Sequence, residues 1–190
     1  DLILDKKLKI INIEEIKTNF ENSKGFSNNI KIYKKNSDFN LKSNSFDFSD
    51  YLNEMLKSEK EKNIFGNFNN LNSLMSIEAN KVFLGDKIYL TYLNGDLKFN
   101  NNKIFKLKLN SNFPNGDDFF FLIDTKNNKK ITTLYSENAE PFVKKFEFVK
   151  GFSEGRIDYS SINEHNISNS TIKIYNFKLK NVPLLTKLLS

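Results

Sequence analysis

Few side chains in this sequence have the chemistry of an active site. There is no cysteine, which excludes disulfides, thiolate metal sites and thiol nucleophiles. The single histidine, His165, stands between Glu164 and Asn166 in a polar turn between two expected strands. A Ser-His-Asp triad or a zinc site needs packed partners that orient the imidazole ring. A histidine alone in a loop is far more often a surface residue, and we interpret His165 as one.

The acidic residues offer no better catalytic site. Asp117 and Asp118 follow an expected turn at residues 114–116 and could contact Ca²⁺, but the spacing of a calcium-binding loop is absent. The glycines form neither a phosphate-binding loop nor a dinucleotide fingerprint. We therefore predict a protein that is not an enzyme and that uses no metal and no cofactor. Two further pairs are interpreted as solvent-exposed or helix-start charges rather than catalytic carboxylates: Glu14 with Glu15, and Glu137 with Glu140.

The charge of the chain raises a nucleic-acid hypothesis that the residue pattern does not favour. The net charge is +6, but the lysines are scattered, as in Lys103, Lys106 and Lys108, and Arg156 is the only arginine. Nucleic-acid binders more often gather arginine and lysine on one face, where arginine makes bidentate contacts. We therefore expect no specific nucleic-acid partner. A solvated basic strand face is the simpler explanation, and attraction to anionic lipid head groups is equally compatible.

Most of the chain alternates apolar and polar residues with a period of two, which predicts β-strands. Phenylalanine is abundant, with 19 residues, so the chain has enough aromatic surface to fold. The alternation is clear in residues 29–33, 38–42 and 75–84, and the last run places four side chains on one face: Met75, Ile77, Ala79 and Phe83.

Three pairs of these runs are separated by turn residues and predict β-hairpins. The first turn is at 100–102 and the second at 126–129, both rich in asparagine, which tolerates the left-handed conformation of tight turns. The third hairpin joins 155–159 to 171–175. The predicted fold class is therefore mainly β: an antiparallel meander that forms a curved, taco-like sheet with two or three short helices.

Three segments have helical rather than strand spacing. Residues 49–57 begin with a serine cap, and residues 136–146 have acidic residues in the first turn and lysines near the end. The third is 181–190. No linker clearly divides the chain. We expect residues 1–72 to supply strands and one helix continuous with the sheet, and residues 73–190 to form the main segment, with any boundary near 59–72.

Some strands are apolar on both faces, notably 88–93 and 119–123. One interpretation is that helices cover one face and a second sheet covers the other. The alternative is a curved sheet that keeps one apolar face partly open as a groove for acyl chains. The sequence pattern alone favours neither.

The C-terminal half resembles a known family in the order of four stretches: 77–85, 135–145, 151–159 and 172–190. The last is the most specific, with a strand that ends in Asn176 and Phe177, then a proline and a leucine-rich helix. These stretches are similar to the AsmA-like C-terminal domains of the YhdP and TamB type in Gram-negative bacteria. The resemblance covers residues 74–190. The chain departs from the family in being rich in asparagine and lysine and poor in glycine and arginine.

The resemblance implies a taco-shaped β-groove that carries phospholipids between the inner and outer membrane. The full-length protein would be anchored in the inner membrane and cross the periplasm, where this segment would lie, with phospholipid acyl chains, membranes and other envelope proteins as partners. The family implies no catalytic residues. The strand positions expected to line the groove are Phe105, Leu107, Leu109, Phe119, Phe121, Ile172 and Ile174.

The end of the chain is expected to cover part of the groove. The segment 181–190 has an apolar stripe at helical spacing, which predicts a short helix that folds over the apolar face and partly plugs the groove. The residues of the expected plug are Val182, Leu184, Leu185, Leu188 and Leu189.

The alternative function is a structural or assembly scaffold for outer-membrane biogenesis that holds no lipid.

Overall fold

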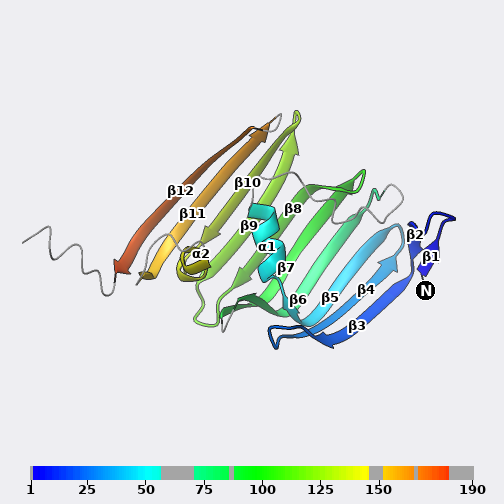
Figure 1. The fold of residues 1–190 in the computed structure, drawn as a ribbon, viewed down its shortest axis with the longest axis horizontal. Helices are drawn as coiled ribbons and strands as arrows, with labels where there is room; N and C mark the ends of the chain where they lie inside the picture. Colours follow the sequence, from blue (N-terminus) through cyan, green and yellow to red (C-terminus); the bar gives the residue numbers. More distant parts are fainter. Residues whose placement is uncertain (1, 57–70, 86–87, 146–151, 165–166, 180–190) are drawn as a thin grey trace, which may run out of the picture.

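The computed structural model describes residues 2–56, 71–85, 88–145, 152–164 and 167–179. These residues form one open sheet of ten strands, in the spatial order β12-β11-β10-β9-β8-β7-β6-β5-β4-β3, and a separate β1-β2 hairpin. Figure 1 shows the strands of the large sheet side by side, with the short helices on one face. The prediction of a mainly β fold with short helices is confirmed.

The N-terminal strands belong to the same sheet as the rest, because β5 pairs with β6. The elements before the first long gap in the described chain are β1 (Leu2–Leu4), β2 (Ile10–Ile13), β3 (Glu15–Glu21), β4 (Ser27–Lys35), β5 (Asp38–Asp47) and α1 (Ser49–Leu56). Those that follow are β6 (Leu74–Gly85), β7 (Ile88–Asn100), β8 (Lys103–Asn112), β9 (Asp118–Lys126), β10 (Lys129–Ser136), α2 (Glu140–Lys145), β11 (Phe152–Glu164) and β12 (Ile167–Leu179).

Asparagine pairs close the two hairpins that the sequence predicts. Asn101 and Asn102 join β7 to β8 with φ of 50° and 63°, and Asn127 and Asn128 join β9 to β10 with φ of 50° and 61°. Two successive residues at positive φ give a turn whose twist matches that of the flanking strands. The third predicted hairpin is also present as β11 and β12. The predicted helix at 49–57 corresponds to α1, whereas the helix predicted at 136–146 begins later, at Glu140.

Because strand side chains alternate between faces, the register defines the two faces of the whole sheet. We call the helix-covered face, which contains the core, the inner face, and the opposite one the outer face. One row of ten paired residues on the inner face, the central apolar row, crosses every strand: Ile172, Tyr159, Leu134, Phe121, Leu109, Gly95, Ile77, Leu41, Ile32 and Ile16. The adjacent row on the outer face is mostly polar: Lys173, Asp158, Tyr135, Phe120, Asn110, Asn94, Glu78, Lys42, Lys31 and Lys17.

The core lies between the inner face and the two helices. Phe48 and Leu52 at α1, and Phe142 and Val143 of α2, belong to the same buried cluster as the inner side chains of β6 to β11. The Phe142 ring stacks on Phe119, with centroids 6.1 Å apart and planes at 7°. Helices cover the centre of the inner face, as one of the two interpretations had it, but the second sheet that it placed over the other face is not found among the described residues.

Two features of the sheet depart from the predicted meander. Strands β5 and β6 are parallel, and residues 48–73, which include α1, separate them in the sequence. Strand β7 has a bulge at Tyr92, whose φ is 55°, so Leu90 and Leu93 both lie in the core although they are three residues apart.

The predicted common face for Met75, Ile77, Ala79 and Phe83 is wrong for Phe83. Val82 and Leu84 lie in the core, so the alternation of β6 changes between Ala79 and Val82. The Phe83 ring instead stacks on Phe26 at a centroid distance of 4.5 Å.

Candidate functional site

The candidate site is the inner face of the sheet, where the sequence predicts a lipid groove. Four of the predicted groove residues are fully buried there: Leu107 is 2% exposed and Phe121 is 0% exposed, and Leu109 and Phe119 are equally enclosed. Close packing of this kind leaves no room for an acyl chain beside these side chains. The interpretation of this central stretch as an open groove is therefore wrong, because the protein's own core fills it.

Phe105 does not join the other predicted groove residues. Strand β8 has an extra residue at this point, since Lys98 pairs with Lys106 whereas Phe99 pairs with Ile104. The extra residue is Phe105, and it breaks the alternation. Ile104 packs against the core instead, and the Phe105 ring lies 5.8 Å from Nζ of Lys98.

The central apolar row becomes accessible to solvent on the last strand. Ile172, the end of the row on β12, is 42% exposed, while its neighbour Ile174 is half-buried against the core. Two further apolar side chains lie beyond them on the same strand: Phe177 is 46% exposed and Leu179 is 37% exposed. Phe177 stacks on Phe152 of β11 with centroids 5.4 Å apart. Ile172 and Ile174 were predicted from the sequence, whereas Phe177 and Leu179 were not.

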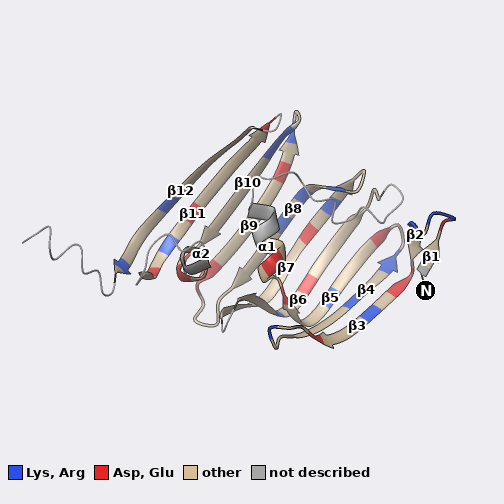
Figure 2. Cartoon of the chain, in the orientation of Figure 1, with Lys and Arg blue, Asp and Glu red and all other residues tan. Residues whose placement is uncertain are grey.

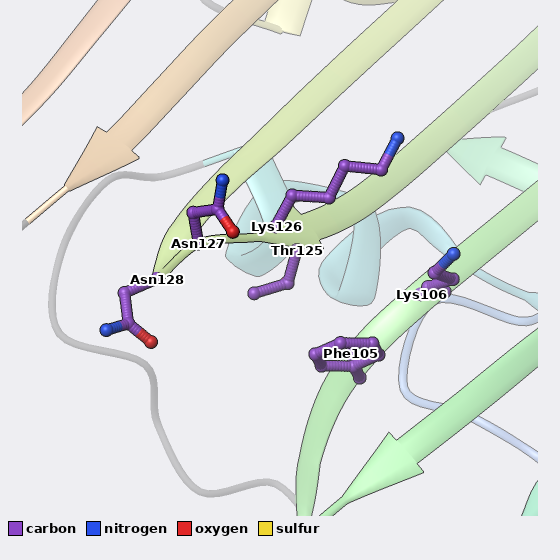
Figure 3. A pocket seen from close by; sticks show the side chains of 6 residues that line it. All are labelled: Phe105, Lys106, Thr125, Lys126, Asn127 and Asn128. Carbon is purple, nitrogen blue, oxygen red and sulfur yellow. The ribbon is translucent and has the colours of Figure 1, made fainter.

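An open pocket of about 430 Å³ lies at the turn end of β8, β9 and β10 (Figure 3). Lys106 and Lys126 both reach Asp124, at 3.4 Å and 2.9 Å. The pKa of Asp124 is held below its ordinary value, first by the hydrogen bond from Lys126. The pocket is lined by Phe105, Lys106, Thr125, Lys126, Asn127 and Asn128.

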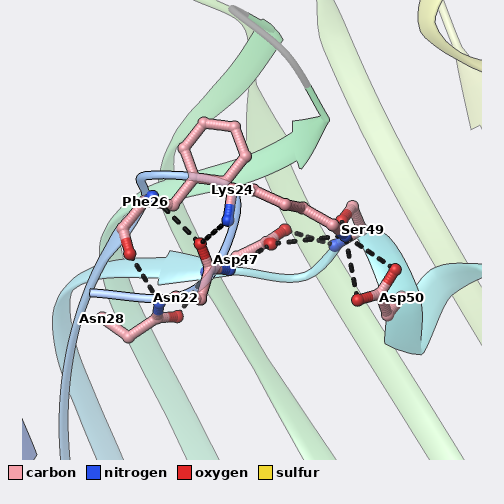
Figure 4. A network of polar contacts seen from close by, with 7 residues as sticks. All are labelled: Asn22, Lys24, Phe26, Asn28, Asp47, Ser49 and Asp50. Atoms are coloured by element: carbon pink, nitrogen blue, oxygen red, sulfur yellow. Dashed lines mark hydrogen bonds and ion pairs between the residues drawn. The ribbon is translucent and has the colours of Figure 1, made fainter. Parts of the chain in front are cut away.

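A polar network joins the β3–β4 turn to the start of α1 (Figure 4). The buried Asp47 carboxylate accepts hydrogen bonds from the Asn22 side chain at 2.7 Å and from the Ser49 backbone at 2.9 Å. Burial alone raises the pKa of Asp47, but these bonds and the nearby Lys24 hold the pKa below its ordinary value. Lys24 also binds Asp50 at 2.8 Å.

This network fixes the strand-to-helix junction rather than forming a reactive site. Asn28, itself buried, accepts a hydrogen bond from the Asp47 backbone at 2.9 Å and donates one to the Phe26 carbonyl. Each oxygen of Asp47 therefore already has a partner, and the side chains meet one another's hydrogen-bonding needs. We assign the network a structural role.

The other acidic residues singled out from the sequence also take part in local contacts. The Asn115 amide donates to Asp117 at 2.7 Å, and the Asn112 amide donates to Asp118 at 2.6 Å. Glu137 accepts the backbone N–H of Asp118 at 2.9 Å, so it closes the β8–β9 loop against the segment before α2. No group of three or more metal-binding side chains occurs within the described ranges.

Glu15 is bound by two lysines on the outer face. Its carboxylate oxygens lie 2.8 Å from Lys17 and 2.8 Å from Lys31. Hydrogen bonds from these two amines, first from Lys17, lower the pKa of Glu15 to about 2.

Some residues singled out from the sequence lie outside the described residues. They are His165 and the predicted plug residues Val182, Leu184, Leu185, Leu188 and Leu189.

No protein-family model matches the chain, and no curated protein or solved structure is significantly similar to it. Within the part of the chain that the structure describes, no helix combines the length and apolar character needed to cross a bilayer.

Proposed function

We propose that this chain is a segment of a larger bacterial envelope protein that binds phospholipid acyl chains on the inner face of its sheet. The proposal rests on one observation: the central apolar row crosses all ten strands and ends solvent-exposed at Ile172. Among the described strands the sheet is open, so no further strand continues this row beyond β12. The order of the four stretches that resemble AsmA-like domains supports the same function.

The burial pattern defines where an acyl chain would lie. The centre of the inner face is filled by core residues, and exposed apolar side chains lie at its two edges: Phe20 on β3, and the larger group of Ile172, Phe177 and Leu179 on β12. Each methylene group that leaves water for such a surface contributes about 0.8 kcal/mol. Lipid tails would therefore bind along β12 and move passively from one apolar surface to the next, while head groups stay in water.

The cellular setting is part of the proposal and rests on the resemblance. The segment would lie in the periplasm, in a full-length protein anchored to the inner membrane, and would pass phospholipid between the two membranes. Anionic head groups would also be compatible with the net charge of +6.

A matched pair of substitutions tests the proposal. Ile172→Lys places a charge at the exposed end of the apolar row. Ile162→Lys places the same charge at a site of similar exposure, 46%, on β11, but on the outer face, since Ile162 pairs with Ile131 and Ile131 with Asp124. Both sites are exposed, so both variants should fold with little loss of stability.

The measurement is native mass spectrometry of gently purified protein, followed by extraction and identification of bound lipid. We expect phospholipid on the wild-type protein, a severalfold lower occupancy for Ile172→Lys, and wild-type occupancy for Ile162→Lys. A wild-type protein without lipid, or an equal loss in both variants, would overturn the proposal.

The buried centre of the inner face favours a second candidate, a structural scaffold without lipid. In that case Leu107, Leu109 and Phe121 serve only as the core of a rigid sheet, and β12 contacts other envelope proteins. The same experiment distinguishes the two candidates, because a scaffold shows no lipid in either variant or in the wild type.

A further inference from the structure

Positive and negative charges are unevenly divided between the two ends of the strands (Figure 2). One end has the turns that join β4 to β5, β7 to β8 and β9 to β10, and we call it the basic rim. Within two positions of these turns there are six lysines and a single acidic residue, Asp38. The lysines are Lys34, Lys35, Lys103, Lys126, Lys129 and Lys130.

The opposite end of the strands has the reverse balance. It has the β3–β4 and β8–β9 turns and the connection from β10 to α2. The same count there gives one lysine and five acidic residues: Lys24, Glu21, Asp117, Asp118, Glu137 and Glu140. An anionic partner is therefore attracted to the basic rim and repelled from the opposite end.

The corner of the basic rim beside β4 has lysines that are not used in ion pairs. Elsewhere on the rim, Nζ of Lys126 lies 2.9 Å from Asp124, and Nζ of Lys129 lies 2.9 Å from Glu164. Lys34 and Lys35 are exposed at the end of β4, and within the described ranges neither forms an ion pair.

The β1–β2 hairpin is attached to this corner. The Glu14 carbonyl accepts the backbone N–H of Lys34 at 2.9 Å, and the Asn12 side chain accepts a hydrogen bond from Nζ of Lys34 at 3.1 Å. The tip of the hairpin, residues 5–9, adds further exposed lysines that have no ion pair in the part of the chain that the structure describes. These tip lysines are Lys6, Lys7 and Lys9.

The hydrogen bonds of the tip hold Leu8 out in solvent. The Asp5 carboxylate accepts the backbone N–H of Lys7 at 2.8 Å and of Lys9 at 2.9 Å, and the Asp5 carbonyl accepts that of Leu8 at 3.0 Å. Leu8 has a φ of 60°, which asparagine and glycine adopt more readily than leucine. Its side chain is 77% exposed. A leucine that is strained, exposed and flanked by lysines indicates a contact with a partner rather than a role in packing.

We propose that the tip of the β1–β2 hairpin docks the protein on the surface of an anionic lipid bilayer. Leu8 enters the boundary between head groups and acyl chains, and the tip lysines contact lipid phosphates. The long lysine side chains reach the head groups while the leucine between them is immersed. Nucleic acid would also attract the lysines, but its binders stack bases on aromatic or arginine side chains, and the tip has neither.

This contact is separate from the proposed acyl-chain surface. The hairpin leads into β3 at one edge of the sheet, whereas β12 forms the other edge. Docking leaves every lipid in its bilayer, so it does not require lipid to bind along β12. Loss of docking and loss of bound lipid are therefore distinct results.

A single inserted tryptophan tests the immersion of the tip, because the sequence contains no tryptophan. Leu8→Trp is compared with Tyr92→Trp, a site with matching exposure of 76% and φ of 55° that lies within β7. With vesicles of phosphatidylethanolamine and phosphatidylglycerol, the Leu8→Trp emission should shift to the blue and be quenched by brominated acyl chains. Tyr92→Trp should show neither change, and vesicles of phosphatidylcholine alone should change neither variant.

Vesicle sedimentation measures the affinity of the same contact. Leu8→Asn suits the positive φ and removes the apolar group, so binding to the anionic vesicles should weaken roughly tenfold. Tyr92→Asn is the matched control and should bind like the wild type. Each lysine near an anionic membrane surface contributes about fivefold in affinity, so glutamine at all three tip lysines should weaken binding more than tenfold. The same charge loss at three exposed lysines outside the rim should have a much smaller effect: Lys42, Lys108 and Lys173.

Four results would overturn the proposal. They are a wild-type protein that does not bind the anionic vesicles, an equal loss in tip and control variants, a Leu8→Trp emission that stays unchanged, and wild-type affinity for Leu8→Asn. Binding to duplex DNA that needs the tip lysines but not Leu8 would identify a general polyanion site instead. If Ile172→Asn rather than Leu8→Asn abolishes sedimentation, the β12 surface holds the vesicle, so the docking proposal is wrong and the acyl-chain proposal is retained.

Discussion

Truncating Leu107 and Ile172 to alanine should have very different effects on stability, although both face the inner side of the sheet. Leu107 is 2% exposed in the centre of the core, and Ile172 is 42% exposed at the edge. Loss of a buried leucine side chain removes transfer free energy and leaves a cavity, which together cost about 2–5 kcal/mol. Ile172→Ala removes a side chain that already contacts water, so we expect a loss of roughly 1 kcal/mol or less.

Urea unfolding followed by circular dichroism measures both effects. With a denaturant dependence of about 2 kcal/mol per M, Leu107→Ala should lower the midpoint by roughly 1–2.5 M, and Ile172→Ala by less than about 0.5 M. The slope of the free energy of unfolding against urea concentration should stay the same in both variants. A shift of the midpoint then reports a change in stability. A Leu107→Ala midpoint within about 0.3 M of the wild type would refute the reasoning, because such a site would have to be open.

Three further predictions concern single positions. Gly95→Ala should lower the urea midpoint, because its methyl group would overlap the Lys108 carbonyl and Leu109; overpacking of this kind costs about 1–3 kcal/mol. Asp47→Asn should destabilise the fold by about 1–3 kcal/mol in the same assay, because its amide would face the donor groups that the carboxylate now binds. The pKa of Glu15 is lowered to about 2 from 4.5, so its contribution is present above pH 4.5 and lost as the pH falls toward 2. The wild type should therefore lose slightly more stability over this pH range than Glu15→Gln, and only slightly, because the site is exposed.

Local signals in the sequence were sufficient for most elements of the fold. Asparagine pairs at 101–102 and 127–128 fix the hairpins, because two successive residues at positive φ exclude most other side chains. The serine at 49 and the apolar spacing after it predict α1 for a similarly local reason. Features of this kind depend on a few neighbouring residues, which a single sequence shows directly.

Features that depend on contacts between distant residues were not predictable. The parallel pairing of β5 and β6 joins strands that residues 48–73 separate in the sequence, and strand alternation does not report the relative direction of such strands. The bulges at Tyr92 and Phe105 shift the alternation by one residue, so the prediction that Phe105 shares a face with Leu107 and Leu109 was wrong. Nothing in the local pattern of Phe105 distinguishes it from Leu107.

The candidate site was predicted only in part, because the sequence does not show what covers an apolar strand face. An apolar strand face has the same sequence whether a helix or a lipid covers it. Leu109 and Phe119 looked like groove residues, but Phe142 and other helix side chains enclose this part of the face. Ile172 is the predicted position that stays exposed, because it belongs to an edge strand with no described neighbour beyond it.

Photo-crosslinking tests the central claim, that acyl chains lie on the inner face along β12, most directly. The wild-type protein is incubated with vesicles that contain a phospholipid with a photoreactive group near the end of one acyl chain. After irradiation, mass spectrometry locates the modified residues. The account predicts adducts at Ile172, Phe177 and Leu179, with few at Ile162 on the opposite face of the neighbouring strand. Adducts spread equally over both faces, or no adducts on β12, would contradict it.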